Sequence, residues 1–280
     1  MRKTTLVAGA AALVLTLSAC GGGDDSAAGG GSGEGNGGNG AAVGNLFKDA
    51  GALADAASQS TSAKKSAKFD MTMAFGGQEM TATGEGEFGD EPKISMKMSM
   101  PGGGQQLETR MIGQTVYVNM GGSWMKSSMD ELGQGGMQSA EMNDPTKLLE
   151  FAQKAGEITD SEETTLNGEP TTHYTIDLDF QKLAAEAGQL TGTDGKMFEG
   201  IDAKVPMEVW LNSDELPVKL TMDMSEMMKQ AAEKAGGNAS QMAQGGMTME
   251  MTYSDWGTPV TVEEPPADQV QEMPTGGMPN

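Results

Sequence analysis

Apolar and polar residues alternate through much of the chain between residues 68 and 256. In the first such segment, Phe69, Met71, Met73 and Phe75 fall on one phase and mostly polar residues fall on the other. A period of two places alternate side chains on opposite faces of a strand, so the pattern predicts half-buried antiparallel strands. About eleven segments qualify: 68–75, 80–88, 93–100, 105–112, 114–120, 123–126, 157–167, 170–178, 205–211, 216–224 and 247–256.

Four other segments repeat apolar residues at helical spacing. The clearest is preceded by Asp144, a good N-cap, begins with Pro145 at the first helical position and is followed by Gly156. The predicted helices are 44–58, 145–155, 180–187 and, more weakly, 226–235. Together the elements predict an α+β domain over 44–264, built on one highly curved antiparallel sheet with helices on one side.

Both ends of the chain differ from this domain. Arg2 and Lys3 precede a short apolar stretch that ends in Leu-Ser-Ala-Cys at residues 17–20, the pattern of a lipoprotein signal peptide cut before Cys20. We therefore expect a signal peptide at 1–19, a diacylglycerol anchor on Cys20 and a flexible Gly-rich linker over 20–43. The Pro/Gly-rich tail, 265–280, is predicted to be disordered.

The charge balance narrows the possible partners. The formal net charge is -22, and Arg110 is the one arginine left after cleavage. Nucleic-acid binding requires clustered Lys and Arg, so we expect no nucleic-acid partner, and an anionic membrane surface should repel the folded domain. The chain should reach the extracytoplasmic face of the cell membrane through its lipid alone. No protein partner can be named.

The sequence contains few of the residues that an enzyme active site requires. His173 is the one histidine, and it falls on the polar phase of its strand without a recognisable nucleophile or orienting carboxylate nearby in the sequence. No phosphate-binding loop is present either. We expect a solvent-facing His173, no catalytic residue and no cofactor.

Methionine is unusually frequent, with 25 residues, and many lie on the apolar phase of the strands. Met is unbranched and adaptable, so a Met-lined sheet face suits a mobile apolar object such as an acyl chain. Met-x-Met spacings also resemble thioether sites for Cu(I). Because burial alone gives the same spacing in a strand, we expect no metal site, and Cu(I) binding is the less favoured alternative.

Several motifs resemble those of a known family. They are DPTKLL at 144–149, VYVN at 116–119 leading to GSWMK at 122–126, Gly168 ahead of THY at 172–174, and YSDWGTPV at 253–260. With the lipobox, they resemble the actinobacterial LppX/LprAFG-type lipoproteins. That family is similar to the LolA/LolB lipoprotein carriers, with a half-open β-barrel whose mouth is covered by helices. The resemblance implies an apolar cavity and a role in binding or moving lipids or lipoglycans in the cell envelope.

The combined hypothesis is an anchored lipoprotein that binds an acyl-bearing lipid or lipoglycan, for transport or sensing, with helix 145–155 as a lid. The competing class is a surface adaptor or regulatory lipoprotein with a filled core and no ligand. The residues expected to line the cavity are Phe69, Met71, Met73, Phe75, Ile94, Met96, Met98, Met100, Met207, Val209, Leu220, Met222, Met249 and Met251.

Overall fold

The computed structural model describes residues 46–89, 91–99, 106–132, 144–191, 200–235 and 246–273. The strands are β1 (Ser66–Phe75), β2 (Gln78–Glu87), β3 (Lys93–Ser99), β4 (Gln106–Ile112), β5 (Thr115–Met120), β6 (Ser123–Ser128), β7 (Gly156–Leu166), β8 (Glu169–Asp179), β9 (Lys204–Asn212), β10 (Pro217–Asp223), β11 (Met247–Ser254) and β12 (Val270–Glu272). The main helices are α1 (Ala50–Lys64), α3 (Pro145–Ala155), α4 (Phe180–Thr191) and α5 (Ser225–Ala235).

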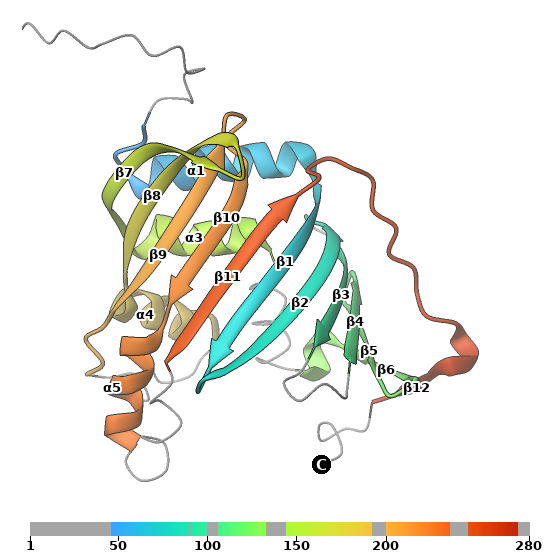
Figure 1. Ribbon diagram of the computed structural model, residues 1–280. Helices are drawn as coiled ribbons and strands as arrows, with labels where there is room; N and C mark the ends of the chain where they lie inside the picture. Colours follow the sequence, from blue (N-terminus) through green and yellow to red (C-terminus); the bar gives the residue numbers. More distant parts are fainter. Residues whose placement is uncertain are drawn as a thin grey trace, which may run out of the picture. The chain divides into compact units, whose positions relative to one another are not determined.

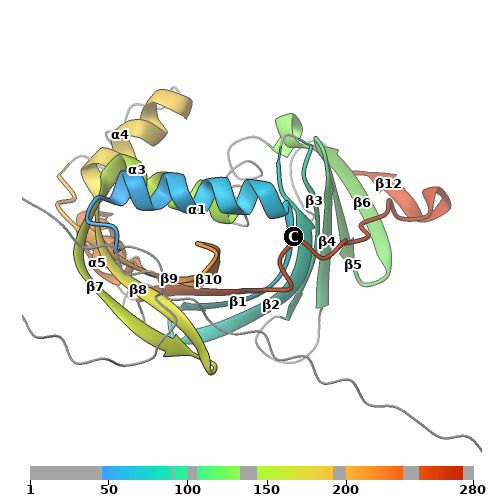
Figure 2. The ribbon, with the colours of Figure 1, turned by 90° about the horizontal axis from the view of Figure 1, so that it is seen from above.

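All twelve strands belong to one sheet, in the order β12-β6-β5-β4-β3-β2-β1-β11-β10-β9-β8-β7. Neighbouring strands are antiparallel except β12 and β6, which run parallel. The sheet is open and strongly curved, and α1 and α3 cross its concave side (Figures 1 and 2). The predicted α+β half-barrel is confirmed, and each of the eleven predicted strands lies within two residues of its expected ends.

The first helix is displaced from its predicted range of 44–58. It begins after Asp49, whose side chain accepts a hydrogen bond from the amide of Ala52, and it continues to Lys64. Leu46, which is inside the predicted range, lies before the helix and is 43% exposed. The buried face runs from Ala50 to Thr61, so the N-cap decides where this helix starts. Likewise α4 continues past Gly188, because an internal glycine costs a helix only about 1 kcal/mol.

The C-terminal segment corrects the prediction of a disordered tail over 265–280. Residues 267–269 form a 3-10 turn, and β12 then pairs with β6; residues after 273 lie outside the described part. On the way, the Glu263 carbonyl accepts a hydrogen bond from Arg110 Nη1 at 2.9 Å, and Glu272 pairs with Lys126. Main-chain pairing with β6 and ion pairs order this segment, and Pro265 is buried and Met273 packs against the core; composition cannot reveal these contacts.

The N-cap of α3 lies where the sequence placed it. Asp144 Oδ1 accepts a hydrogen bond from the amide of Thr146 at 2.8 Å, Pro145 follows at the first helical position, and Leu148 and Leu149 are buried. Burial raises the pKa of the Asp144 carboxyl above its ordinary 3.8, against the opposing effect of the hydrogen bonds from Thr146. Ionisation of the Asp144 carboxyl therefore lowers the stability of the folded protein.

Asp144→Asn should therefore stabilise the protein at neutral pH. Asn caps a helix as well as Asp does but cannot ionise. Because the folded state binds this proton more tightly, wild-type stability falls as pH rises from 3.8 through the raised pKa, and the variant should lose its advantage below pH 3.8. Melting temperatures of both proteins across this range test the prediction. Asp49→Asn, at the exposed cap of α1, is the control and should change little; an equal effect at both caps would contradict the burial argument.

Candidate functional site

The strand register places the described residues of the predicted cavity on one face of the sheet. Met71 lies opposite Met251 on one side and Ala82 on the other, and Ala82 lies opposite Met98. Directly opposite residues share a face, so the methionine phase of neighbouring strands forms continuous rows on the concave side. Met100 lies outside the described residues.

Nine of these residues form a packed interior rather than the wall of an open cavity. Met207, Val209, Leu220 and Met251 have 0% exposed surface, so no space the size of a water molecule adjoins their side chains. They belong to one core cluster with residues of α1 and α3. The nine buried residues are Phe69, Met71, Ile94, Met207, Val209, Leu220, Met222, Met249 and Met251.

The remaining four described residues are only half buried, and all lie toward one end of β1 and β3. Along β1 the exposed fraction rises from 1% at Phe69 to 6% at Met71, and Met73 and Phe75 beyond them are half buried. Two residues absent from the prediction continue this surface: Met80, opposite Met73, and Leu107, opposite Met98. We call the set the open methionine patch: Met73, Phe75, Met80, Met96, Met98 and Leu107.

Helix placement explains why the patch is open. The main helix contacts with the sheet are those of α3 and α1 with β7, of α3 and α4 with β8, and of α5 with β9 and β11. The helices therefore cover the β7–β11 half of the concave face more completely than β1–β4. Met80 was detectable as part of the apolar phase of its strand, but no sequence signal shows which half a helix will cover.

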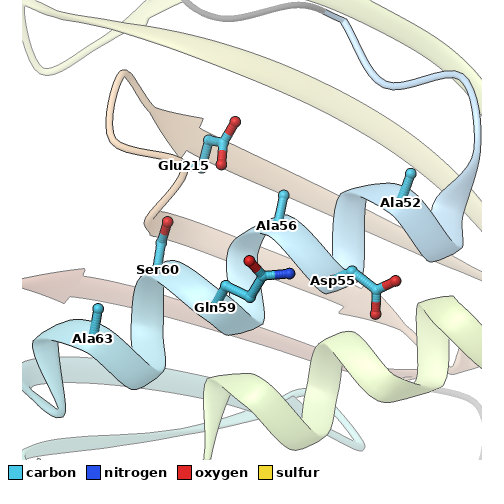
Figure 3. A pocket seen from close by; sticks show the side chains of 7 residues that line it. All are labelled: Ala52, Asp55, Ala56, Gln59, Ser60, Ala63 and Glu215. Carbon is cyan, nitrogen blue, oxygen red and sulfur yellow. The ribbon is translucent and has the colours of Figure 1, made fainter.

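A separate depression of about 510 Å³ lies beside α1 (Figure 3). It is lined by small or polar side chains, and Glu215 faces the α1 residues from the turn between β9 and β10. The full lining is Ala52, Asp55, Ala56, Gln59, Ser60, Ala63 and Glu215. This lining contains two carboxylates and no large apolar side chain, so it does not suit an acyl chain.

His173 lies on the opposite, convex face, as its strand phase predicted. It is not free in solvent, because its ring stacks on Trp210 with centroids 4.2 Å apart. Glu162 and Glu208 approach the two ring nitrogens at 3.6 and 3.9 Å, and Lys219 lies over the Trp210 ring. This cross-strand ladder of stacked and charged side chains stabilises a wet sheet face and presents no nucleophile beside a base.

Two features are absent from the described residues. No group of three or more His, Cys, Asp or Glu side chains in that part of the chain could hold a metal ion. Nor is any helix there long and apolar enough to span a bilayer. Cys20, the signal peptide at 1–19 and the linker over 20–43 lie outside the described residues, so the lipid anchor stays a prediction.

Comparison with known proteins gives structural matches but no sequence matches. No protein-family model and no curated protein matches the chain. The crystal structure of LprF from Mycobacterium bovis is 13% identical, with 77% of this chain and 96% of that chain covered and a TM-score of 0.49. The Mycobacterium tuberculosis lipoprotein LppX is 15% identical, with 76% and 98% covered and a TM-score of 0.47.

The similarity to both lipoproteins extends over about three quarters of this chain. A LolA superfamily protein from Nitrosomonas europaea also matches, at 14% identity over 79% of this chain and 96% of that chain, with a TM-score of 0.27. LprF and LppX belong to the group that the sequence motifs resembled. At these identities the likeness concerns the fold alone, so the ligand has to be argued from this chain's own residues.

Proposed function

We propose that the protein is a lipid-anchored cell-envelope lipoprotein that binds an acyl-bearing lipid or lipoglycan at the open methionine patch. The observation that supports this most is the unequal cover of the concave face: one half is sealed by helices and the other presents half-buried Met, Phe and Leu side chains. A concave apolar surface next to a rigid, filled core is a suitable binding site for one or more acyl chains. Transport and sensing both require such a binding site.

The chemistry of the patch suits a disordered chain better than a rigid ligand. Met73, Met80, Met96 and Met98 can each change rotamer at low cost, so the surface can adapt to an acyl chain of variable length. None of the six patch residues is charged, so the patch itself offers no fixed contact to an anionic headgroup. We therefore propose recognition through the acyl part of the ligand.

A filled-core adaptor without a ligand is the second candidate. The observation in its favour is that nine of the predicted cavity residues are buried in the core, including Met207 and Met251 at 0% exposure. The two candidates differ only in the state of the open methionine patch. In the adaptor, that patch would contact a protein partner or remain bare.

A photoreactive fluorescent fatty acid distinguishes the two. If the patch binds acyl chains, the delipidated full chain should take up the probe, and crosslinks should map to peptides with Met73, Met80, Met96 or Met98. Peptides with Met207 or Leu220 should remain unlabelled, because these side chains have no exposed surface. No uptake, or labelling without preference for the patch, would favour the adaptor.

The anchor has its own test. Changing Cys20 to Ala should abolish lipid labelling and either release the protein or leave an unprocessed precursor, because the thiol carries the diacylglycerol. Partition between detergent and aqueous phases after metabolic acyl labelling measures this. Ser18→Ala keeps a small residue before the cut and should behave as wild type. Detergent partition of a processed Cys20→Ala protein would refute the lipid anchor.

A further inference from the structure

The methionines on the concave face fall into two groups that differ in exposure. Met207 and Met251 have 0% exposed surface, and Met249 has 1%. A small dissolved oxidant can reach these side chains only when the core opens. The second group presents part of its surface to solvent in the folded protein. It consists of the four half-buried methionines of the open methionine patch: Met73, Met80, Met96 and Met98.

The four patch methionines lie on three consecutive strands. Met73 of β1 is directly opposite Met80 of β2, and Met96 and Met98 are two residues apart on the same face of β3. All six patch residues are Met, Phe or Leu, so no patch side chain donates a hydrogen bond. A polar group introduced here would therefore find no partner among the patch side chains.

The thioether allows a reaction that Leu or Phe does not. Its sulfur attacks one oxygen of hydrogen peroxide, the O–O bond breaks, and the sulfur keeps that oxygen as a sulfoxide. The other oxygen leaves as water with both peroxide protons. The sulfur is oxidised by two electrons and the peroxide is reduced, so no further reactant is needed. The product is polar and chiral where the thioether was apolar.

We propose that the open methionine patch is an oxidation site, and that sulfoxide formation there by peroxide switches acyl binding off. An acyl chain lying on a sulfoxide would remove it from water without offering a hydrogen bond, which is a costly arrangement for a polar group. The fold is retained, because the core methionines are out of reach of the oxidant. This regulation rests on the proposed acyl site.

Leucine substitution separates oxidation from apolar surface. Met→Leu keeps hydrophobicity and approximate volume but removes the sulfur. The test variant carries leucine at all four patch methionines. Before oxidation, this variant should fold and take up the acyl probe as wild type does, and so should a matched control. The control carries leucine at four half-buried methionines outside the patch: Met125, Met227, Met228 and Met273.

The measurement is uptake of a fluorescent fatty acid by the delipidated full chain before and after treatment with hydrogen peroxide. Sulfoxides are mapped by peptide mass spectrometry, and melting temperatures are recorded. Wild type and the control should lose at least about tenfold in affinity with little change in melting temperature, whereas the test variant should keep its affinity. Methionine sulfoxide reductases with a dithiol should restore uptake by wild type, the oxygen leaving as water while the dithiol becomes a disulfide.

Failure of the acyl site and failure of the switch give different results. No uptake by untreated wild type would overturn both. Unchanged uptake after peroxide, absence of sulfoxide from the patch, or an equal loss in the test variant would overturn the switch alone. If the test variant does not fold, wild type decides: partly oxidised protein is separated on immobilised fatty acid, and patch sulfoxide should be enriched in the unbound fraction. Equal sulfoxide in the bound and unbound fractions would overturn the switch.

Discussion

Met98→Glu should abolish uptake of an acyl probe with little change in melting temperature, whereas Met207→Glu should leave little folded protein. Met98 is half buried in the open methionine patch, so a carboxylate there can keep part of its hydration. In the complex it would face an acyl chain, where an unpaired charge is costly. Met207 has 0% exposed surface, and an uncompensated charge in such a place costs on the order of 4 kcal/mol. That is a large part of the 5–15 kcal/mol that typically stabilises a domain.

Met98→Leu is the control for Met98→Glu. It conserves apolar surface, so both probe uptake and stability should stay near wild type. The measurements are thermal unfolding of delipidated protein and titration with a fluorescent fatty acid. If Met98→Glu unfolds as readily as Met207→Glu, the patch is part of the packed core. If Met98→Glu folds and still binds the probe, the acyl site lies elsewhere. Either result would remove the basis for the proposed function.

Most of the fold could be predicted because its signals are local. A strand with one covered face carries its own alternation, and so all eleven strands predicted from it are present. Asp144 and Pro145 specified the start of α3 through neighbouring residues only. The errors at α1 and at the C-terminal segment concern competing or non-local signals. The N-cap at Asp49 moved the start of α1 from the predicted residue 44, and β12 is ordered by pairing with β6, a strand more than 140 residues earlier in the chain.

The site was predictable in part, for the same reason. Strand phase identified the concave face correctly, since phase is a property of each strand. It could not separate Met73, which is half buried, from Met249, which lies directly opposite and is 1% exposed. The difference in exposure depends on where α1, α3 and α5 pack on the folded sheet.

Replacing Gly84 by any larger residue should destabilise the protein strongly. A Cβ atom at this position would lie 2.4 Å from Cζ of Phe69 and 2.6 Å from the main-chain oxygen of Ser95. Phe69 is 1% exposed, so its ring has no empty space to enter, and the Ser95 oxygen belongs to the adjacent strand β3. Phe69 of β1 lies directly opposite Gly84 of β2, and the absence of a side chain at Gly84 leaves room for the Phe69 ring.

Gly84→Ala should lose about 1–3 kcal/mol through overpacking, and Gly84→Val more. The backbone at residue 84 is not in the left-handed region, so the loss comes from contact and not from a conformation reserved for glycine. Reduced freedom of the unfolded chain works the other way, by at most about 1 kcal/mol. Chemical denaturation of each variant gives the free energy of unfolding.

A double-mutant cycle identifies the contact responsible. Phe69→Leu removes the ring that the new methyl group would meet, so Gly84→Ala should cost less in the Phe69→Leu background than in wild type. Thr83→Ala, at the exposed neighbouring position on the convex face, should change stability by no more than about 0.5 kcal/mol. Equal costs of Gly84→Ala in both backgrounds would show that the main-chain oxygen of Ser95, and not the Phe69 ring, requires glycine there. A Gly84→Ala protein as stable as wild type would mean that β2 and β3 can separate locally, and the core beside the open methionine patch would then be softer than its burial indicates.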